Sequence, residues 1–288
     1  MSAKLFSAQH KSAKTSSPKP LARKRFGQHF LVDRSVINAI CSAIEPRDDQ
    51  IIVEIGPGPG ALTGALLERI SYLRAVEIDR DLAALLRRVF PPDRLNLHLG
   101  DALAFDFLSF LPELKHGKPT EQKLRLVGNL PYNISSPLMI RLLSICGQVS
   151  DMHFMLQKEV VERIAASPGT SAYGRLSVML AACFDATHLF NVPPSAFDPP
   201  PKVDSAVVRL ITKAPEQRLD PAVMAFLESL LGRAFAQKRK MLRSSFIPWL
   251  DAQGVDSSMI PGTDRAEDIP AEIYFQLATT LRSINSIL

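Results

Sequence analysis

The chain has 288 residues, of which 46% are hydrophobic, 22% charged and 7% aromatic. This composition is typical of a globular protein, and at about 150 residues per domain the length predicts one large or two modest domains. The three cysteines are too few and too scattered for a disulfide framework or a zinc site, so we expect no metal and a reducing compartment. Because there is no apolar run near the roughly 18 residues of a membrane span and no signal-peptide segment, we expect a cytoplasmic protein without a membrane partner.

The net charge of +5 is concentrated in two basic segments. Residues 1–28 hold seven basic residues and no acidic one, so the remaining 260 residues sum to −2. A second acid-free segment, 229–250, adds five more basic residues, which we call the C-terminal basic cluster. Such clusters are typical of nucleic-acid binding, although a basic run is more often a solvated surface. The candidate contacts are Arg23, Lys24 and Arg25 in the first segment and Arg233, Lys238, Arg239, Lys240 and Arg243 in the cluster.

The predicted elements follow an N-terminal arm, residues 1–20, whose Ser, Ala and Lys content and lack of periodicity predict disorder. Helical spacing of apolar residues predicts a first helix over 34–44. Short apolar strands then alternate with helices, which is the pattern of a parallel sheet covered on both faces. We expect strands at 51–55, 73–79, 95–99, 124–128 and 152–156, and helices at 61–70, 81–90, 136–145 and 158–166.

The predicted secondary structure changes twice in the last part of the chain. Apolar runs at 186–192 and 204–212, joined by a proline-rich segment, predict an antiparallel pair that closes the sheet edge. Beyond Pro215 the pattern is helical, with helices expected at 221–237, 238–250 and 271–284. We therefore predict an α/β fold with a boundary near residue 213, giving a ligand-binding sheet domain over 21–213 and a smaller all-helical domain over 214–288.

A glycine-rich turn, residues 56–60, follows the first strand of the sheet. Glycines such as Gly56 and Gly58 allow a tight turn and a close approach of the backbone to a ligand. The second strand carries Glu77, 21 residues after Gly56, near the spacing at which a carboxylate meets ribose hydroxyls. Asp79 is the competing carboxylate, and we expect it to be a solvated cap of the next helix. This unit occurs in dehydrogenases, flavoproteins and methyltransferases alike.

The third strand ends at Gly100 and Asp101. The Asp101 carboxylate can accept a hydrogen bond from the amino group of an adenine ring, while a turn-capping role is the alternative. Polar features at the carboxyl ends of three successive strands predict one pocket, because ligands of open α/β sheets collect at that edge. The pattern indicates an adenosine-bearing ligand.

The most discriminating motif, Gly128-Asn129-Leu130-Pro131-Tyr132, ends the fourth strand. An Asn-x-Pro-aromatic sequence at this place resembles the methyltransferases that act on adenine N6. With the segments RKRFGQHFL, VEIGPGPGALT, VGNLPYNISSPL, FMLQKEVVERI, YGRLSVML and PPSAFDPPPKVDSAVVRL, it is similar to the KsgA/RsmA family of ribosomal RNA adenine dimethyltransferases. The resemblance covers about residues 21–288.

This resemblance implies a Rossmann-like class I methyltransferase sheet and S-adenosylmethionine as cofactor. It implies N6,N6-dimethylation of two adjacent adenosines in the 3′-terminal hairpin loop of 16S ribosomal RNA during small-subunit biogenesis. The partner would be small-subunit ribosomal RNA within an assembling 30S subunit, bound by a monomer whose helical domain orients the RNA.

The motif suits this chemistry because an adenine amino group is a poor nucleophile with two hydrogens. If the Asn129 side-chain oxygen and the Leu130 carbonyl accept those hydrogens, the nitrogen can aim its lone pair at a sulfonium methyl. Pro131 stiffens the turn, and Tyr132 offers a face for the unstacked base. The reaction needs no metal and no general base, since the proton can leave after transfer.

Three further residues are implied by the resemblance. The segment that contains His29 and Leu31 lies over the cofactor in the family, so both are candidate cofactor contacts. A common family pattern has Asn where this chain has His29; a backbone contact would survive that change, while a side-chain hydrogen bond would not. Phe197 resembles a second aromatic over the flipped base, and a loop anchor is the equal alternative.

Three other functions fit parts of the sequence. A nicotinamide dehydrogenase would use the glycines and Glu77, but it would have no use for the motif at 129–132. A non-catalytic RNA-binding assembly factor could retain the fold, although intact Glu77, Asp101 and Asn129 favour activity. The erythromycin-resistance methyltransferases modify large-subunit RNA, and the extended match at 193–210 favours the small-subunit enzymes.

Overall fold

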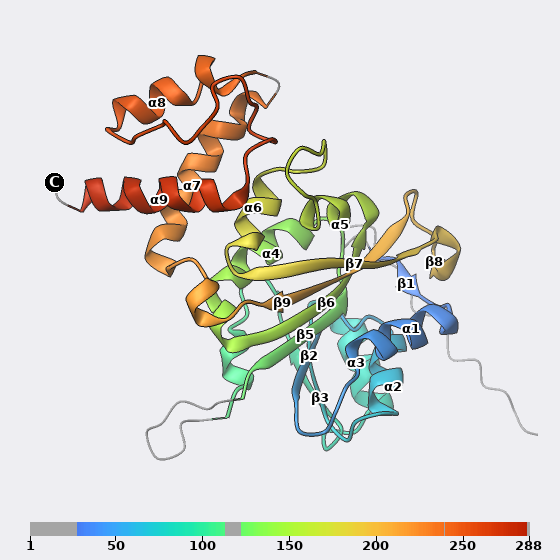
Figure 1. The fold of residues 1–288 in the computed structure, drawn as a ribbon. Helices are drawn as coiled ribbons and strands as arrows, with labels where there is room; N and C mark the ends of the chain where they lie inside the picture. The colour runs from blue at the N-terminus through green and yellow to red at the C-terminus, as the bar shows by residue number, and fades with distance from the viewer. Residues whose placement is uncertain (1–27, 113–121, 239, 287–288) are drawn as a thin grey trace, which may run out of the picture.

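The computed structural model describes residues 28–112, 122–238 and 240–286 (Figure 1). The predicted disordered arm, the candidate contacts Arg23, Lys24 and Arg25, and Arg239 of the C-terminal basic cluster lie outside the described residues. No helix in the described part of the chain is long and apolar enough to cross a membrane.

The central sheet of the described chain has seven strands in the order β4-β3-β2-β5-β6-β9-β7. Five of them pair in parallel, and β9 runs antiparallel between β6 and the edge strand β7, so the predicted parallel sheet closed by an antiparallel pair is confirmed. The strands are β2 (Ile51–Ile55), β3 (Leu73–Glu77), β4 (Leu95–Leu99), β5 (Leu124–Asn129), β6 (Val149–Gln157), β7 (Phe184–Val192) and β9 (Ser205–Thr212).

Six helices of the described chain cover the two faces of this sheet (Figure 1). Alternate residues of a strand point to opposite faces, and β2 shows it: Ile51 and Val53 pack with α4, α5 and α6, whereas Ile52 packs with α1, α2 and α3. Helix α6 is not among the predicted elements. The helices are α1 (Arg34–Ile44), α2 (Ala61–Leu67), α3 (Arg80–Val89), α4 (Ser135–Leu142), α5 (Lys158–Ile164) and α6 (Arg175–Ala181).

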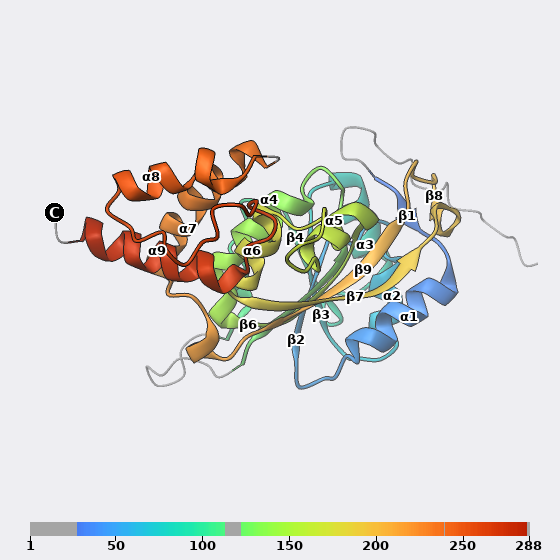
Figure 2. The ribbon, with the colours of Figure 1, turned by 45° about the horizontal axis from the view of Figure 1, so that its top comes forward.

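The C-terminal part is helical, as predicted, and lies at the end of the molecule away from α1 (Figure 2). It contains α7 (Pro221–Ala234), α8 (Ile247–Ala252) and α9 (Ala271–Asn285). Short 3₁₀ turns in the described chain lie at Phe107–Phe110, Leu143–Gln148, Pro194–Ala196, Pro215–Gln217, Phe235–Gln237 and Leu242–Ser244.

The predicted continuous helix over 238–250 is wrong. The backbone is extended at Met241, with ψ at 143°, and the amides of Leu242 and Arg243 donate to carbonyls of Asp264 and Gly262 instead of to their own turn. Helix α8 begins only at Ile247, because Pro248 is tolerated in the first turn of a helix and not in its interior.

A second, two-stranded sheet joins distant segments of the chain. Strand β1 (Phe30–Leu31) pairs antiparallel with β8 (Phe197–Asp198), so the N-terminal segment and the proline-rich segment lie side by side. This pairing holds the residues around His29 against the carboxyl edge of the main sheet.

The close approach of β5 to β2 depends on Gly128, because a Cβ atom there would clash with the main-chain carbonyl oxygen of Ile55. We expect Gly128→Ala to lower the free energy of unfolding by about 1–3 kcal/mol, the usual cost of overpacking, as measured by urea denaturation. Gly232 in α7 is the matched control, since an added Cβ meets nothing within 4 Å. Gly232→Ala should instead stabilise by about 0.5–1 kcal/mol. A Gly128→Ala protein as stable as wild type would show that β5 can shift at no cost.

Candidate functional site

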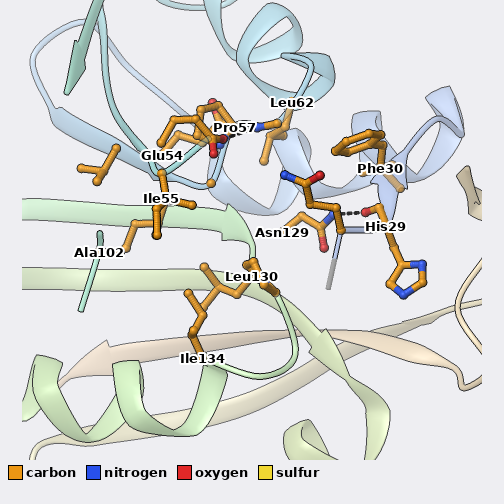
Figure 3. A pocket seen from close by; sticks show the side chains of 18 of the residues that line it. His29, Phe30, Glu54, Ile55, Pro57, Leu62, Ala102, Asn129, Leu130 and Ile134 are labelled. Atoms are coloured by element: carbon orange, nitrogen blue, oxygen red, sulfur yellow. Dashed lines mark hydrogen bonds between the residues drawn. The ribbon is translucent and has the colours of Figure 1, made fainter. Parts of the chain in front are cut away.

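A cavity of about 270 Å³ lies at the carboxyl ends of β2, β3, β4 and β5 (Figure 3). The N-terminal segment around His29 closes it from the side. The cavity brings together ten of the residues singled out in the sequence: His29, Leu31, Gly56, Gly58, Glu77, Asp101, Asn129, Leu130, Pro131 and Tyr132. The structure therefore gathers residues from five separate segments into one site.

Glu77 and the glycine-rich turn form one hydrogen-bonded unit. The Gly58 amide donates to Glu77 Oε2 at 3.0 Å, and the Asp79 amide donates to Oε1 at 2.8 Å. Gly56 and Gly58 have φ of 69° and 59°, which L side chains rarely adopt, so the turn requires glycine. Burial raises the pKa of Glu77, against the lowering effect of these amides. A nearly buried carboxylate is thus held in place at the end of β3.

Asp79 caps α3, as predicted, by accepting from the Asp81 amide at 2.9 Å. The expectation that it is solvated is wrong, because Asp79 is only 2% exposed. Asp101 also uses one oxygen in a turn, where Oδ1 accepts from the Leu103 amide at 2.9 Å. Asp101 is exposed and lines the cavity, so the capping contact and a ligand contact are compatible.

Asn129 is the last residue of β5, and its amide group is oriented by a distant main-chain atom. Its Nδ2 donates to the carbonyl oxygen of His29 at 2.9 Å, the dashed contact in Figure 3. This contact fixes the orientation of the amide group, with its nitrogen toward His29 and its oxygen on the other side of the group. The contact reaches His29 through its backbone, so it does not depend on the side chain at that position.

After Asn129, the rest of the Asn129–Tyr132 motif forms a turn that hydrogen bonds hold in place. The Leu130 amide donates to the Met155 carbonyl at 3.1 Å, and the Ile134 amide donates to the Pro131 carbonyl at 3.1 Å. The Tyr132 hydroxyl lies 2.7 Å from Ser205 Oγ on β9, and burial raises the pKa of Tyr132. The residues from Asn129 to Tyr132 are thus tied to the neighbouring strand β6 and to β9, the strand beyond it.

Phe197 does not line the cavity. Phe197 is 4% exposed and packs in the cluster that contains Leu31, its partner in the β1–β8 pairing. This placement is that of a loop anchor, the alternative considered for this residue. Contact of Phe197 with a base would require the ring to leave this cluster.

Two of the cavity residues that were not singled out in the sequence bear on ligand binding. Glu54 in β2 is 1% exposed, burial raises its pKa to about 7, and Thr63 Oγ1 donates to it at 2.6 Å. A lone carboxylate inside an apolar strand was the signal that could have revealed it. Ile78 follows Glu77 and is 42% exposed within the cavity lining, which gives a flat ligand an apolar surface.

The C-terminal basic cluster divides into two kinds of residue. Arg233, Lys240 and Arg243 are exposed. The Lys238 amine instead contacts the carbonyls of Ser171 and Tyr173 at 2.7 and 3.1 Å and Glu267 Oε2 at 3.0 Å. An ammonium group has three donors, so these contacts can use all of the donors of Lys238, and its RNA contact stays a prediction.

Comparison with known proteins gives consistent results. The family model described as ribosomal RNA adenine dimethylase matches residues 20–283. A ribosomal RNA small subunit methyltransferase A from Bordetella pertussis is 52% identical over 260 residues, which cover 90% of this chain and 94% of that protein. The protein of the same description from Dechloromonas aromatica is 50% identical, with 91% of this chain and 98% of that protein covered.

Two solved structures share the architecture. A dimethyladenosine transferase from Plasmodium falciparum has a TM-score of 0.71 at 25% identity and covers 89% of this chain and 98% of its own. The 23S rRNA methyltransferase ErmE has a TM-score of 0.64 at 26% identity, and the match covers 88% of this chain and 99% of ErmE. The predicted Rossmann-like class I methyltransferase sheet is confirmed. The family match over nearly the whole chain and the motif that ends β5 together show that this chain belongs to the ribosomal RNA adenine dimethylase family.

Proposed function

We propose that this chain transfers methyl groups from S-adenosylmethionine to N6 of two adjacent adenosines in the 3′-terminal hairpin loop of 16S ribosomal RNA. The observation that carries the proposal is the orientation of Asn129, whose amide nitrogen is occupied by His29 so that its oxygen is available to a substrate amino group. Small-subunit RNA is favoured over large-subunit RNA because the two small-subunit relatives are about half identical to this chain, against 26% for ErmE.

The cavity suits S-adenosylmethionine. Glu77 supplies a buried carboxylate for ribose hydroxyls, Ile78 an apolar surface for the adenine ring, and the turn at Gly56 and Gly58 a close backbone approach. Asp101 is the acceptor for the adenine amino group. When bound, the cofactor supplies an electrophilic methyl group on a sulfonium.

Asn129 and Leu130 perform the central task of the chemical step. The Asn129 oxygen and the Leu130 carbonyl accept the two amino hydrogens, which makes the nitrogen more tetrahedral and directs its lone pair at the methyl carbon. The site would hold this nitrogen toward the methyl group that a bound sulfonium cofactor supplies, and the amino proton would then pass to water. Tyr132 holds the unstacked base by its ring face.

The remaining parts of the proposal concern the RNA. Arg233, Lys240 and Arg243 are exposed on the helical segment, which we infer orients the RNA as the sheet domain acts on it. We infer a cytoplasmic monomer that works on an assembling 30S subunit. Mapping methylated adenosines in ribosomal RNA from cells with and without the protein tests the substrate directly, and unchanged small-subunit RNA would overturn it.

Glu77→Ala should weaken S-adenosylmethionine binding by about 1.5–3 kcal/mol, the usual loss for hydrogen bonds to a charged group. Isothermal calorimetry measures the affinity, with circular dichroism as a check on folding. Glu77 also accepts from two backbone amides, so Glu77→Gln, which keeps one oxygen acceptor, should lose less. Unchanged affinity in a folded Glu77→Ala protein would remove Glu77 from the site.

Asn129→Ala should lower the rate of methyl transfer by about 10²–10³, as for other preorganised polar groups in active sites. Single-turnover kinetics at saturating RNA and cofactor measure this step, and cofactor affinity should fall less than the rate. Asn96→Ala is the matched control, since Asn96 is exposed on β4 and lies outside the cavity lining. A normal rate for Asn129→Ala would contradict its role as acceptor.

Replacing Arg233, Lys240 and Arg243 together by Ala should reduce RNA affinity and flatten its salt dependence. The log–log slope should fall by about 0.7–0.9 for each phosphate that the variant no longer neutralises. RNA affinity at several salt concentrations measures the slope. Lys238→Ala serves as the contrast, because its amine already contacts the Ser171 carbonyl and the Glu267 carboxylate, so the slope should stay unchanged. Parallel lines for the triple variant and wild type would show that these charges are a solvated surface.

A further inference from the structure

The side chain of His29 lies on one face of the Tyr132 ring. The two ring centroids lie 5.7 Å apart, with 28° between the ring planes, which is an offset stack. Both residues line the cavity. In the proposed function Tyr132 offers a ring face to the target adenine, and the His29 imidazole already lies on one of its two faces.

No base fits between these two rings as they stand. A ring inserted into a stack needs about 3.5 Å on each side, so the flanking rings would have to be about 7 Å apart. The observed separation of 5.7 Å is shorter than that. One of the two rings must therefore move before a base can stack on this face.

Tyr132 is the ring that is held in place. Its hydroxyl lies 2.7 Å from the Oγ of Ser205, the fully buried first residue of β9. Its backbone carbonyl accepts from Ser135 Oγ at 2.9 Å. Moving the ring would leave a buried hydroxyl without its partner, which is costly.

His29 is held by its main chain rather than by its ring. Its carbonyl accepts from Asn129, and the next residue, Phe30, pairs with Asp198. The ring donates from Nδ1 to the Pro199 carbonyl at 2.9 Å, in an exposed position where water can replace the carbonyl. Figure 3 shows the ring turned away from Asn129, so rotation of the side chain leaves the Asn129 contact intact.

We propose that His29 is a removable cover of the base-stacking face. The target adenine displaces the imidazole from Tyr132, while the His29 carbonyl keeps Asn129 oriented. The inference rests on the proposed function, because it takes Tyr132 as the stacking partner of the base. It gives His29 a part in specificity: a base without an amino group gains nothing from Asn129 and must still compete with the imidazole.

The test compares His29→Ala with wild type on a hairpin RNA that carries the 3′-terminal 16S sequence. Removing the cover should lower KM for the RNA by about 2- to 12-fold, the equivalent of one aromatic pair, with the effect on KM rather than on kcat. Proton NMR of wild type gives an independent readout. The Tyr132 ring current should shift the His29 imidazole signals upfield in the free enzyme. Added RNA should return these signals to the chemical shifts of a solvent-exposed histidine.

His188→Ala is the matched control, because His188 lies on β7 outside the cavity lining and its ring contacts Asn191 at 2.9 Å. Its KM for RNA should equal that of wild type. A raised KM for His29→Ala, or His29 signals that stay upfield in the RNA complex, would overturn this proposal. Either result would show that the His29 ring stays in place when the RNA binds. A wild-type enzyme that methylates neither the hairpin nor the small subunit that contains it would instead overturn the proposed function, and the cover with it.

Discussion

Strand β5 lies so close to β2 that Gly128 has no room for a side chain, and the site is assembled around this approach. Asn129 follows Gly128 directly and therefore lies beside the glycine-rich turn that follows β2. A Cβ atom on Gly56 would lie 3.8 Å from the Asn129 carbonyl oxygen. Parallel strands bring their carboxyl ends to one edge of a sheet. The close approach of β5 to β2 then sets the distance between the residues proposed to hold the cofactor and those proposed to hold the base.

The two polar side chains that matter most are both fixed by backbone atoms of another segment. Glu77 accepts from the amide of Gly58, and Asn129 donates to the carbonyl of His29. Side chains oriented before the ligand arrives need no reorganisation during the reaction, which is the main source of electrostatic catalysis. The small β1–β8 sheet is therefore part of the proposed active site, since it holds the segment that orients Asn129.

The sequence predicted the features that depend on residues close together in the chain. Strand alternation, the glycine-rich turn and the Asn129 motif follow from periodicity and residue type, and they appear in the structure where the sequence places them. The placement of the Lys238 and Phe197 side chains could not be predicted in this way, because their partners are far away in the chain. Lys238 contacts the carbonyl of Tyr173, and Phe197 packs in the cluster that contains Leu31. The break after Lys238 was signalled by Pro248, but the carbonyls that replace the helical hydrogen bonds come from residues 262 and 264.

Near residue 213 the chain changes from alternating strands and helices to helices, but one hydrophobic core continues across this point. Leu227 and Leu230 of α7 belong to the same buried cluster as Val178 and Leu180 of α6, which also contains Val53 of the sheet. Lys238 adds a polar link by contacting Ser171 in the segment between α5 and α6. The helical segment is therefore not a module that can be exchanged for another unit by cutting the chain at the boundary. A replacement would have to reproduce the apolar surface that packs against α6, so only the exposed side of these helices is free of that constraint.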